Sequence, residues 1–260
     1  MLVTGGAGYL GAELVRRAGD RGWDVRATWR TRRPELDADW IRADVRDEEA
    51  MRRAAEGVDV VVHTAYRQRE EAWSTNNDGS RSVARAAHAA RARLIHLSTD
   101  LVFRGDRGCY VESDVPDPVN EYGRSKAAAE RVVRAVHPDA LVVRTSLLYG
   151  GSEPGPQERL ACEGTSFFVD EIRSPVVVGD LAEALLELAP LDLSGPLHLG
   201  GADDVSRYDF ALLLGADPAR IEAAHTTPDR AANVSLDSSR ARSLLATRLR
   251  GVREVLGDDR

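Results

Sequence analysis

Tyr122 and Lys126 are the two residues of this sequence whose types and spacing indicate chemistry. They stand four positions apart, so in a helix they lie on one face, one turn from each other. The residues that follow, Ala-Ala-Ala-Glu-Arg-Val-Val-Arg, favour a helix. An ammonium group near a phenol stabilises the phenolate and lowers the phenol's pKa from its ordinary value of about 10, which makes the tyrosine a usable acid or base. Because Tyr-x-x-x-Lys also arises by chance, the interpretation depends on the elements that would position the pair.

The composition is that of a soluble globular protein with one large domain, or one domain and a small annex. The chain has 260 residues, of which 43% are hydrophobic and 30% charged. A net charge of -7 argues against a nucleic-acid partner, although the arginines at positions 30, 32 and 33 could still bind an anion.

Cysteine use and hydropathy predict a cytoplasmic location. Cys109 and Cys162 are the only cysteines, which argues against a disulfide scaffold or a zinc ribbon, and no metal site is predicted. No apolar run is long enough to span a bilayer, and the chain begins with an apolar strand rather than a basic and apolar leader, so no membrane association is expected.

Glycines near the N-terminus predict a dinucleotide site. Residues 2–4 form a short apolar strand, residues 12–21 a helix and residues 24–29 a second strand. The loop between the first strand and the helix carries Gly5, Gly8 and Gly11. This spacing allows a tight turn, close approach of the backbone to a pyrophosphate, and close packing of helix on strand, while the helix N-terminus offers free N–H groups to the phosphates.

The end of the second strand indicates which nicotinamide cofactor binds. A carboxylate at that place would accept hydrogen bonds from the ribose 2′-hydroxyl, whereas an arginine accommodates a 2′-phosphate. This chain has Trp29 and Arg30 there, and its next carboxylate is Glu35. A guanidinium suits phosphate and either side chain could stack on adenine, so we expect NADP(H) rather than NAD(H). The alternative is that these arginines only solvate a loop.

Further strands and helices alternate as in a parallel, doubly wound sheet, so the predicted class is α/β. We expect strands at residues 40–45, 58–65, 94–97 and 139–144, and helices at 46–56, 77–92 and from Tyr122. Ligands of such sheets bind at the carboxyl ends of the strands, where Thr64, Ala65, Tyr66, Ser98, Thr99 and Asp100 fall. Asp44 could accept the adenine amino group or cap a helix, and His63, inside a strand, is expected to be a core residue.

The C-terminal part shows weaker periodicity. We expect a loop on the substrate side at residues 151–164, a strand at 174–178, a helix at 179–188, a strand at 197–200, and helices at 208–214 and 238–256. The predicted organisation is a Rossmann domain at 1–150 and a mainly substrate-binding, small C-terminal subdomain at 151–260, with 174–188 returning to the Rossmann core.

Four motifs in order resemble one family, the extended short-chain dehydrogenase/reductases, and within it the dTDP-4-dehydrorhamnose reductase-like, sugar-nucleotide-binding subgroup. The motifs are Val-Thr-Gly-Gly-Ala-Gly-Tyr-Leu-Gly at 3–11, Ser-Thr-Asp-Leu-Val-Phe at 98–103, Tyr-Gly-Arg-Ser-Lys at 122–126 and Arg-Thr-Ser at 144–146. The resemblance continues through residues 170–175, 180–182 and 206–208 and so spans nearly the whole chain.

This resemblance implies a role for each matching residue. Tyr122 would protonate the substrate carbonyl oxygen, Lys126 would lower the pKa of Tyr122 and bind the nicotinamide ribose, and Thr99 would bond the same carbonyl oxygen. Together with the residues argued above, the predicted cofactor contacts are Gly5, Gly8, Tyr9, Leu10, Gly11, Trp29, Arg30, Asp44, Val45, Thr64, Ala65, Tyr66 and Lys126. The implied substrate contacts are Ser98, Asp100, Leu101, Leu147 and Arg173.

Two positions depart from the sugar reductases of this subgroup. They usually carry a tyrosine where this chain has Leu101 and a tryptophan where it has Leu147. Residues 151–167 also look shortened, as if a helix of the substrate region were reduced. The catalytic residues are therefore those of the family, whereas the substrate pocket differs.

The sequence favours an NADPH-dependent reductase of a keto group on a nucleotide-activated sugar, most simply a dTDP-4-keto-6-deoxy sugar. One alternative is an NAD(P)-dependent sugar epimerase or dehydratase, and another is a reductase of a non-sugar carbonyl or an imine. A third is a non-catalytic subunit that binds NADP and a partner protein. The protein is expected to be a monomer or a homodimer.

Overall fold

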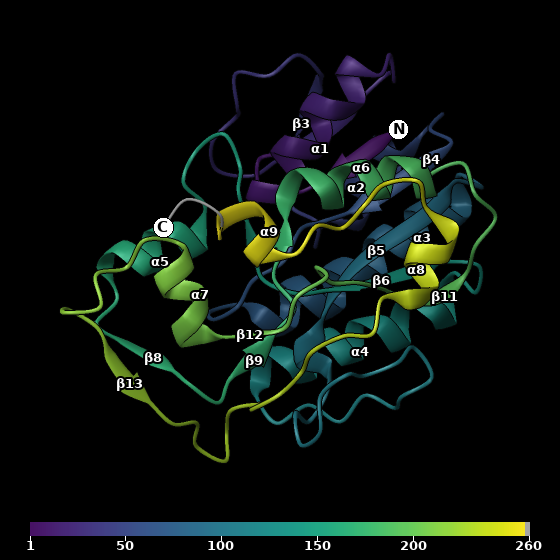
Figure 1. The fold of residues 1–260 in the computed structure, drawn as a ribbon. Coiled ribbons are helices and arrows are strands. Elements are labelled where there is room, and N and C mark those ends of the chain that lie inside the picture. The colour runs from purple at the N-terminus through teal and green to yellow at the C-terminus, as the bar shows by residue number, and fades with distance from the viewer. Residues whose placement is uncertain (258–260) are drawn as a thin grey trace. The chain divides into compact units, whose positions relative to one another are not determined.

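The computed structural model describes residues 1–257, and this part of the chain divides into two compact units. Unit 1 comprises Met1–Ser98, Arg124–Val143 and Ala182–Pro196. Unit 2 comprises Thr99–Gly123, Arg144–Leu181 and the described residues from Leu197 onward. Figure 1 labels the helices and strands of both.

A seven-stranded sheet in the order β11-β6-β5-β4-β1-β2-β3 is the main element of the fold. Its strands are β1 (Leu2–Thr4), β2 (Arg26–Trp29), β3 (Asp39–Arg42), β4 (Val60–His63), β5 (Arg93–Thr99), β6 (Leu141–Thr145) and β11 (Gly195–Leu199). The pairings from β3 through β2, β1 and β4 to β5 are all parallel. The predicted α/β class, a doubly wound Rossmann sheet followed by smaller C-terminal elements, is confirmed.

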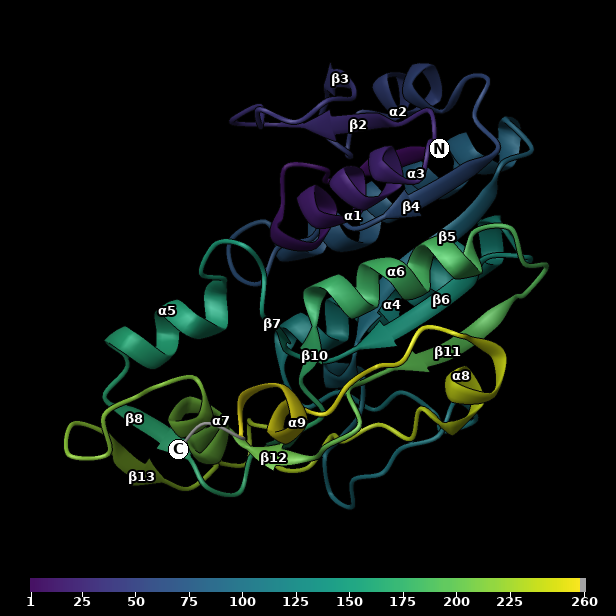
Figure 2. The ribbon, with the colours of Figure 1, turned by 45° about the horizontal axis from the view of Figure 1, so that its top comes forward.

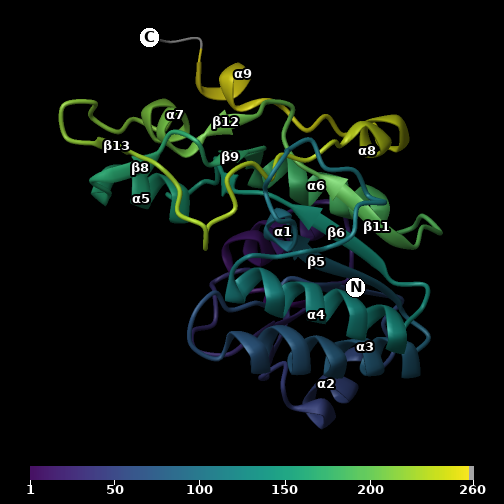
Figure 3. The ribbon, with the colours of Figure 1, turned by 90° about the horizontal axis from the view of Figure 1, so that it is seen from below.

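Helices cover both faces of the sheet in unit 1. They are α1 (Tyr9–Asp20), α2 (Glu48–Ala55), the π-helical turn η1 (Ser74–Gly79), α3 (Ser80–Ala89), α4 (Glu121–Val136) and α6 (Val178–Leu188). Figure 3 shows α2, α3 and α4 on one side of the strands and α1 on the other. The core beneath α2, α3 and α4 contains Leu2, Met51, Val83, Leu94 and Val133, all at most 1% exposed. Each such side chain contributes about 1.5–3 kcal/mol by leaving water.

Unit 2 is built from short elements. They are η2 (Asp100–Val102), β7 (Leu148–Tyr149), α5 (Pro156–Glu163), β8 (Ser166–Phe168), β9 (Ile172–Arg173), β10 (Val176–Val177), β12 (Val205–Ser206), α7 (Arg207–Leu213), β13 (Glu222–Ala224), α8 (Ser239–Leu244) and α9 (Val252–Leu256). Three two-stranded sheets pair β10 with β7, β12 with β9 and β13 with β8. The β13–β8 pair lies beside α5 and α7, which Figure 2 shows together.

The prediction of a loop at residues 151–164 is wrong, because α5 occupies Pro156–Glu163. Gly155 is its N-cap and Pro156 its first residue, an arrangement typical of a helix start. Ala161 is the one buried residue of α5, so the helix has little apolar periodicity to reveal it. Ala161 packs with Phe167 and Ala211 in a small cluster of unit 2.

The prediction of one helix at residues 238–256 is also wrong. Two short helices, α8 and α9, stand there, and residues 245–251 between them are not helical. Asp180 accounts for the break, because its carboxylate accepts from the Arg250 backbone N at 3.1 Å and from Nη2 at 2.7 Å. The Arg250 N–H is therefore used by a distant side chain instead of a helical carbonyl.

Boundaries differ by a few residues elsewhere. The helix predicted at 77–92 is α3, preceded by the π-helical η1, and the strand predicted at 40–45 is β3 and stops at Arg42. The strands β8, β9, β12 and β13 are too short to give a period-2 pattern and were not predicted. Among the residues described, none of the helices has both the length and the apolar character that crossing a bilayer requires.

Candidate active site

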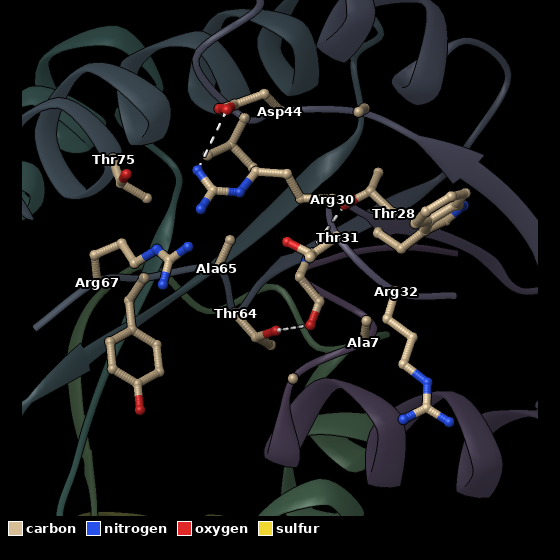
Figure 4. Close-up of a pocket in the computed structure, with 16 residues that line it drawn as sticks. Ala7, Thr28, Arg30, Thr31, Arg32, Asp44, Thr64, Ala65, Arg67 and Thr75 are labelled. Atoms are coloured by element: carbon tan, nitrogen blue, oxygen red, sulfur yellow. Dashed lines mark hydrogen bonds and ion pairs between the residues drawn. The ribbon is translucent and has the colours of Figure 1, made fainter. Parts of the chain in front are cut away.

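A cavity of about 390 Å³ lies at the carboxyl ends of β1, β2 and β4 in unit 1. It brings together nine of the predicted cofactor residues, namely Gly5, Gly8, Trp29, Arg30, Asp44, Val45, Thr64, Ala65 and Tyr66. Its wall also includes residues that were not among the predicted contacts, namely Ala7, Thr28, Thr31, Arg32, Ala43, Arg67 and Thr75. Figure 4 shows these side chains around the open centre.

Gly5 lines the cavity at a position where no larger residue fits. Its φ of +73° is disfavoured for residues with a side chain, and a Cβ would lie 2.7 Å from the backbone N and Cα of Ala65. Thr28 Oγ1 accepts from the Gly5 backbone N at 3.0 Å, and Thr64 Oγ1 donates to the carbonyl of Thr4 at 2.8 Å. These bonds tie the glycine turn to β2 and β4.

The N-terminus of α1 is available to an anion. Gly8 is the N-cap and has no side chain to cap with, and the first turn, Tyr9-Leu10-Gly11, is uncharged. A Cβ on Gly11 would collide with the carbonyl oxygen of Gly5, so this glycine lets the helix pack closely on the loop. Tyr9, Leu10 and Gly11 lie in this turn and outside the cavity lining.

Charged side chains on one side of the cavity form a neutral network. Arg30 Nη1 lies 3.5 Å from Asp44 Oδ2 and 3.3 Å from Glu71 Oε2. Arg46 binds the same two carboxylates, at 2.6 Å for Asp44 and 2.8 Å for Glu71. The hydrogen bond from Arg46 lowers the pKa of Asp44 to about 2. In Figure 4 the Arg30 guanidinium turns toward Asp44.

Asp44 does not cap α2, so of the two roles predicted for it only the contact with adenine remains. Asp47 caps α2 by accepting from the Ala50 backbone N at 3.0 Å. Trp29 is also partnered, since the guanidinium carbon of Arg42 lies 5.5 Å from the centre of its ring. Glu71 lies 41 positions from Arg30 in sequence, and no local pattern indicated that they would meet.

Thr75 offers a buried polar atom at the cavity wall. Its side-chain oxygen has no hydrogen-bond partner among the described residues, and the residue is 6% exposed. A buried hydroxyl without a partner is costly unless a ligand or water bonds it. Thr75 belongs to the π-helical turn η1, a type of distortion often found at functional sites.

Asn76, next to Thr75, holds the cavity wall to the helix that carries Lys126. Its amide accepts from the Arg67 backbone N at 2.9 Å and donates to the Arg67 carbonyl at 2.8 Å and to Ser125 Oγ at 2.9 Å. Asn76 and Ser125 are both fully buried. Sequence reasoning missed Asn76 because its partners are nine and 49 positions away.

Lys126 lies on the buried face of α4. Lys126, Ala129, Glu130 and Val133 are each at most 5% exposed, and their spacing is that of one helix face. Lys126 Nζ donates to the carbonyl oxygen of Leu97 at 2.7 Å, two residues before the end of β5. Burial lowers the pKa of Lys126 from 10.5 to about 8, which Glu130 partly opposes. Tyr122 is one turn earlier on the same helix.

His63 is a core residue, as predicted. It is 1% exposed, and its ring nitrogens lie 2.6 Å from Thr4 Oγ1 and 3.0 Å from Ser80 Oγ. Burial, assisted by the charge of Lys126, lowers the pKa of His63 to about 3. His63 is therefore neutral at physiological pH.

Unit 2 holds the second group of predicted site residues. Asp100 and Arg173, 2% and 4% exposed, form an ion pair with 2.7 Å between Oδ1 and Nη1. Thr99 Oγ1 donates to Asp100 Oδ1 at 3.0 Å, and Ser146 Oγ donates to Oδ2 at 2.6 Å. Leu101 follows Asp100 in η2, and Leu147 packs at the edge of an apolar cluster that includes Tyr149 and Phe210.

Further charges surround Arg173 within unit 2. Arg173 Nη2 lies 3.4 Å from Glu171 Oε1, and Arg230 Nη2 lies 2.6 Å from Glu171 Oε2. Burial opposes the charge of Arg173, but Asp100 and Glu171 outweigh it and raise its pKa. The pKa of Arg207 is lowered to about 10, mainly by burial and secondly by repulsion from the charge of Arg173.

Ser98 is the remaining predicted substrate contact. It belongs to unit 1, is 5% exposed, and its hydroxyl donates to Glu130 Oε1 at 2.5 Å. The hydroxyl is thereby engaged with α4.

Comparison with known proteins identifies the family. The family model described as RmlD substrate binding domain matches residues 1–258. The chain belongs to this family. A dTDP-4-dehydrorhamnose reductase of Mycolicibacterium smegmatis is 35% identical over 284 residues, which cover 99% of this chain and 84% of that protein.

Two further comparisons bear on function. The crystal structure of dTDP-4-dehydrorhamnose reductase from Bacillus anthracis str. Ames in complex with NADP has a TM-score of 0.81 and 25% identity, and the match covers 98% of this chain and 96% of that one. Methionine adenosyltransferase 2 subunit beta of Bos taurus is 28% identical over 283 residues, covering 94% of this chain and 82% of that protein. The predicted membership of the extended short-chain dehydrogenase/reductases is confirmed, and so, at the level of the family, is the predicted class of NAD(P)-dependent oxidoreductase.

Proposed function

We propose that this protein is an NADPH-dependent reductase of the keto group of a nucleotide-activated sugar, with a dTDP-4-keto-6-deoxy sugar as the substrate type. The observation that carries the proposal is Lys126, a buried amine with a pKa of about 8 placed one helical turn after Tyr122. Burying an amine is costly, and a cationic group beside a phenol has a chemical use in lowering the phenol's pKa.

The unit 1 cavity suits a nicotinamide dinucleotide. Gly5 leaves space that a Cβ would fill, α1 presents an uncapped N-terminus, and Thr75 presents a buried oxygen with no partner among the described residues. The residues proposed to hold the cofactor are Gly5, Gly8, Tyr9, Leu10, Gly11, Trp29, Arg30, Asp44, Val45, Thr64, Ala65, Tyr66 and Lys126, to which the structure leads us to add Thr75. When bound, the dihydronicotinamide supplies the hydride.

The protein contributes a proton and positioning. Tyr122 donates the proton to the carbonyl oxygen as the alcohol forms, and the charge of Lys126 stabilises the phenolate that remains. Thr99, at the end of β5, is the third proposed catalytic residue. The proposed substrate contacts are Ser98, Asp100, Leu101, Leu147 and Arg173, and region 151–260 is proposed to supply most of the sugar-nucleotide site.

Arg30 supports NADP(H) over NAD(H), because a guanidinium at the end of β2 can take a 2′-phosphate. Asp44 and Glu71 compete for the same guanidinium, so the preference is expected to be moderate. The cytoplasmic location, and a monomer or homodimer as the working form, stay predictions.

A non-catalytic regulatory role is the second candidate, and the similarity to methionine adenosyltransferase 2 subunit beta favours it. The two functions differ in their need for Tyr122. A regulatory subunit would bind NADPH without consuming it, and its effect on a partner would survive Tyr122→Phe.

NADPH oxidation with a panel of nucleotide 4-keto-6-deoxy sugars tests the proposal, with NADH and Tyr122→Phe as controls. Turnover that prefers NADPH and requires Tyr122 is the expected result. Tight NADPH binding without turnover on any member of the panel would contradict it and favour the regulatory role.

A further inference from the structure

Arg46 binds the two carboxylates beside the unit 1 cavity more closely than Arg30 does. Its Nε and Nη2 donate to the two oxygens of Asp44 at 2.9 and 2.6 Å, and its Nη1 donates to Glu71 Oε1 at 2.8 Å. Arg30 Nη1 lies 3.5 Å from Asp44 and 3.3 Å from Glu71. Two parallel N–H···O bonds to one carboxylate are the strong form of this contact. The contacts of Arg30 are therefore the ones that a ligand can replace.

The two arginines differ in their relation to the cavity. Arg30 and Asp44 line it, whereas Arg46 and Glu71 are not among its lining residues. Figure 4 shows the Arg30 guanidinium directed at Asp44 across the edge of the cavity. A 2′-phosphate that binds Arg30 has to draw it away from Asp44 and Glu71. Both carboxylates then still have Arg46 as a partner, so neither is left without a counter-ion.

Glu71 stays beside the cavity whichever way Arg30 turns, because its main chain is fixed. Its carbonyl oxygen accepts from the Thr75 backbone N at 2.9 Å and from Ser74 Oγ at 3.2 Å, at the start of η1. Its φ is +61°, in the left-handed region that is uncommon for residues with a side chain. The negative charge of Glu71 therefore has to be balanced where it stands.

The charge balance at this edge of the cavity depends on Arg46. Its hydrogen bond is the largest cause of the lowered pKa of both Asp44 and Glu71, so both are ionised at neutral pH. Without Arg46, the two carboxylates would exceed Arg30 by one negative charge. That excess would attract Arg30 and repel a phosphate, which itself carries a charge of about -1.5 to -2.

We propose that Arg46 is a specificity-determining residue for NADP(H), which acts as the fixed counter-ion of Asp44 and Glu71 and thereby leaves Arg30 able to bind the 2′-phosphate. Arg46 acts through Arg30 and not by contact with the cofactor, so it is a positioning residue. The inference rests on the proposed use of NADP(H), and it adds a residue outside the cavity to those that select the cofactor.

Dissociation constants of NADPH and NADH, measured by fluorescence titration without substrate, test the inference. Arg46→Met removes the charge, and Arg46→Lys keeps it. Arg53→Met is the matched control, because it removes the same charge from α2, where Arg53 is exposed and pairs with Glu49. The Arg46 backbone N also donates to Asp44 Oδ1 at 3.0 Å, so one bond that holds Asp44 remains in each variant.

We expect Arg46→Met to weaken NADPH binding about five- to tenfold and NADH binding less than twofold. Arg46→Lys should keep the preference for NADPH within about twofold of wild type, and Arg53→Met should leave both dissociation constants within about twofold. Glu71→Gln, added to Arg46→Met, removes the excess negative charge and should restore most of the preference. Equal weakening of both cofactors by Arg46→Met would overturn the inference, because Arg46 would then only support the structure around Asp44.

The outcomes separate this inference from the proposed function. If the wild type binds NADPH more tightly than NADH and Arg46→Met keeps that preference, the inference is wrong and the proposed function stands. If the wild type binds both cofactors equally, or neither, the proposed use of NADP(H) fails and the inference fails with it. A protein that oxidises NADPH with no sugar would lose the reductase assignment, but the two dissociation constants would still decide the role of Arg46.

Discussion

Replacing Lys126 with methionine should make the protein more stable and less active. Burial lowers the pKa of Lys126 from 10.5 to about 8, and one pKa unit corresponds to about 1.4 kcal/mol. The buried charge therefore reduces the free energy of unfolding by about 3 kcal/mol at pH 7. Methionine removes that penalty but leaves the carbonyl of Leu97 without its donor, which costs about 1 kcal/mol. The expected net gain is about 2 kcal/mol.

The gain should depend on pH in a defined direction. Between about pH 8 and 10.5 the unfolded state binds more protons at Lys126 than the folded state does, so wild-type stability rises with pH in that window. The difference between Lys126→Met and wild type should then shrink toward zero or below as the pH approaches 10.5.

Urea unfolding at several pH values measures this difference, and NADPH oxidation measures the loss of turnover. Arg131→Met is the matched control, because Arg131 is exposed on the same helix and its loss should change stability by less than about 0.5 kcal/mol. A Lys126→Met variant less stable than wild type at pH 7 would refute the reasoning, since the buried ammonium would then stabilise the fold.

Three further outcomes follow from the site geometry and its charges. Tyr122→Phe should lower kcat by about 10²–10⁴ while leaving the NADPH dissociation constant unchanged, and a variant with wild-type turnover would contradict the assignment of the proton donor. Glu71→Gln frees Arg30 from one carboxylate and should tighten NADPH binding about two- to fivefold without changing NADH binding. Arg30→Ala should weaken NADPH binding more than NADH binding. Equal effects on the binding of both cofactors, measured by fluorescence titration, would argue against a contact between Arg30 and the 2′-phosphate. His63, with a folded pKa of about 3 against 6.5 unfolded, should reduce stability by about 2 kcal/mol as the pH falls to 5, and His63→Gln should flatten that slope in urea titrations.

The Rossmann sheet could be predicted because its signals are local. Residues 58–65 and 94–97 are apolar runs of strand length, and glycines punctuate the first turn. Unit 2 was harder, since its strands are two or three residues long and its helices bury few side chains. The break between α8 and α9 could not be predicted from local sequence, because the Arg250 backbone N–H donates to Asp180, 70 positions away.

In the candidate site, too, local features could be predicted from the sequence and contacts between distant segments could not. The glycine loop, Tyr122 and Lys126 were apparent from spacing, since a turn and a helix face are local geometry. The partners of those residues were not. Glu71 reaches Arg30 from 41 positions away, and Asn76 reaches Ser125 from 49. Counting arginines near β2 therefore overstated the positive charge at the cavity, because Arg30 is paired with Asp44 and Glu71, two carboxylates that come from other segments.

Buried charges distinguish groups kept for chemistry from groups kept for structure. The pair Asp100–Arg173 is buried but mutually compensated, so its presence alone argues only that the geometry around Thr99 is fixed. Lys126 is compensated only in part: its ammonium donates to the neutral carbonyl of Leu97, and although the charge of Glu130 opposes the effect of burial, its pKa still falls. A buried charge that lowers the free energy of unfolding and stabilises no other part of the fold indicates a catalytic role. The loss of activity and the gain of stability in Lys126→Met should therefore occur together. A stabilised variant with full turnover would separate the two effects and leave the buried lysine without a chemical role.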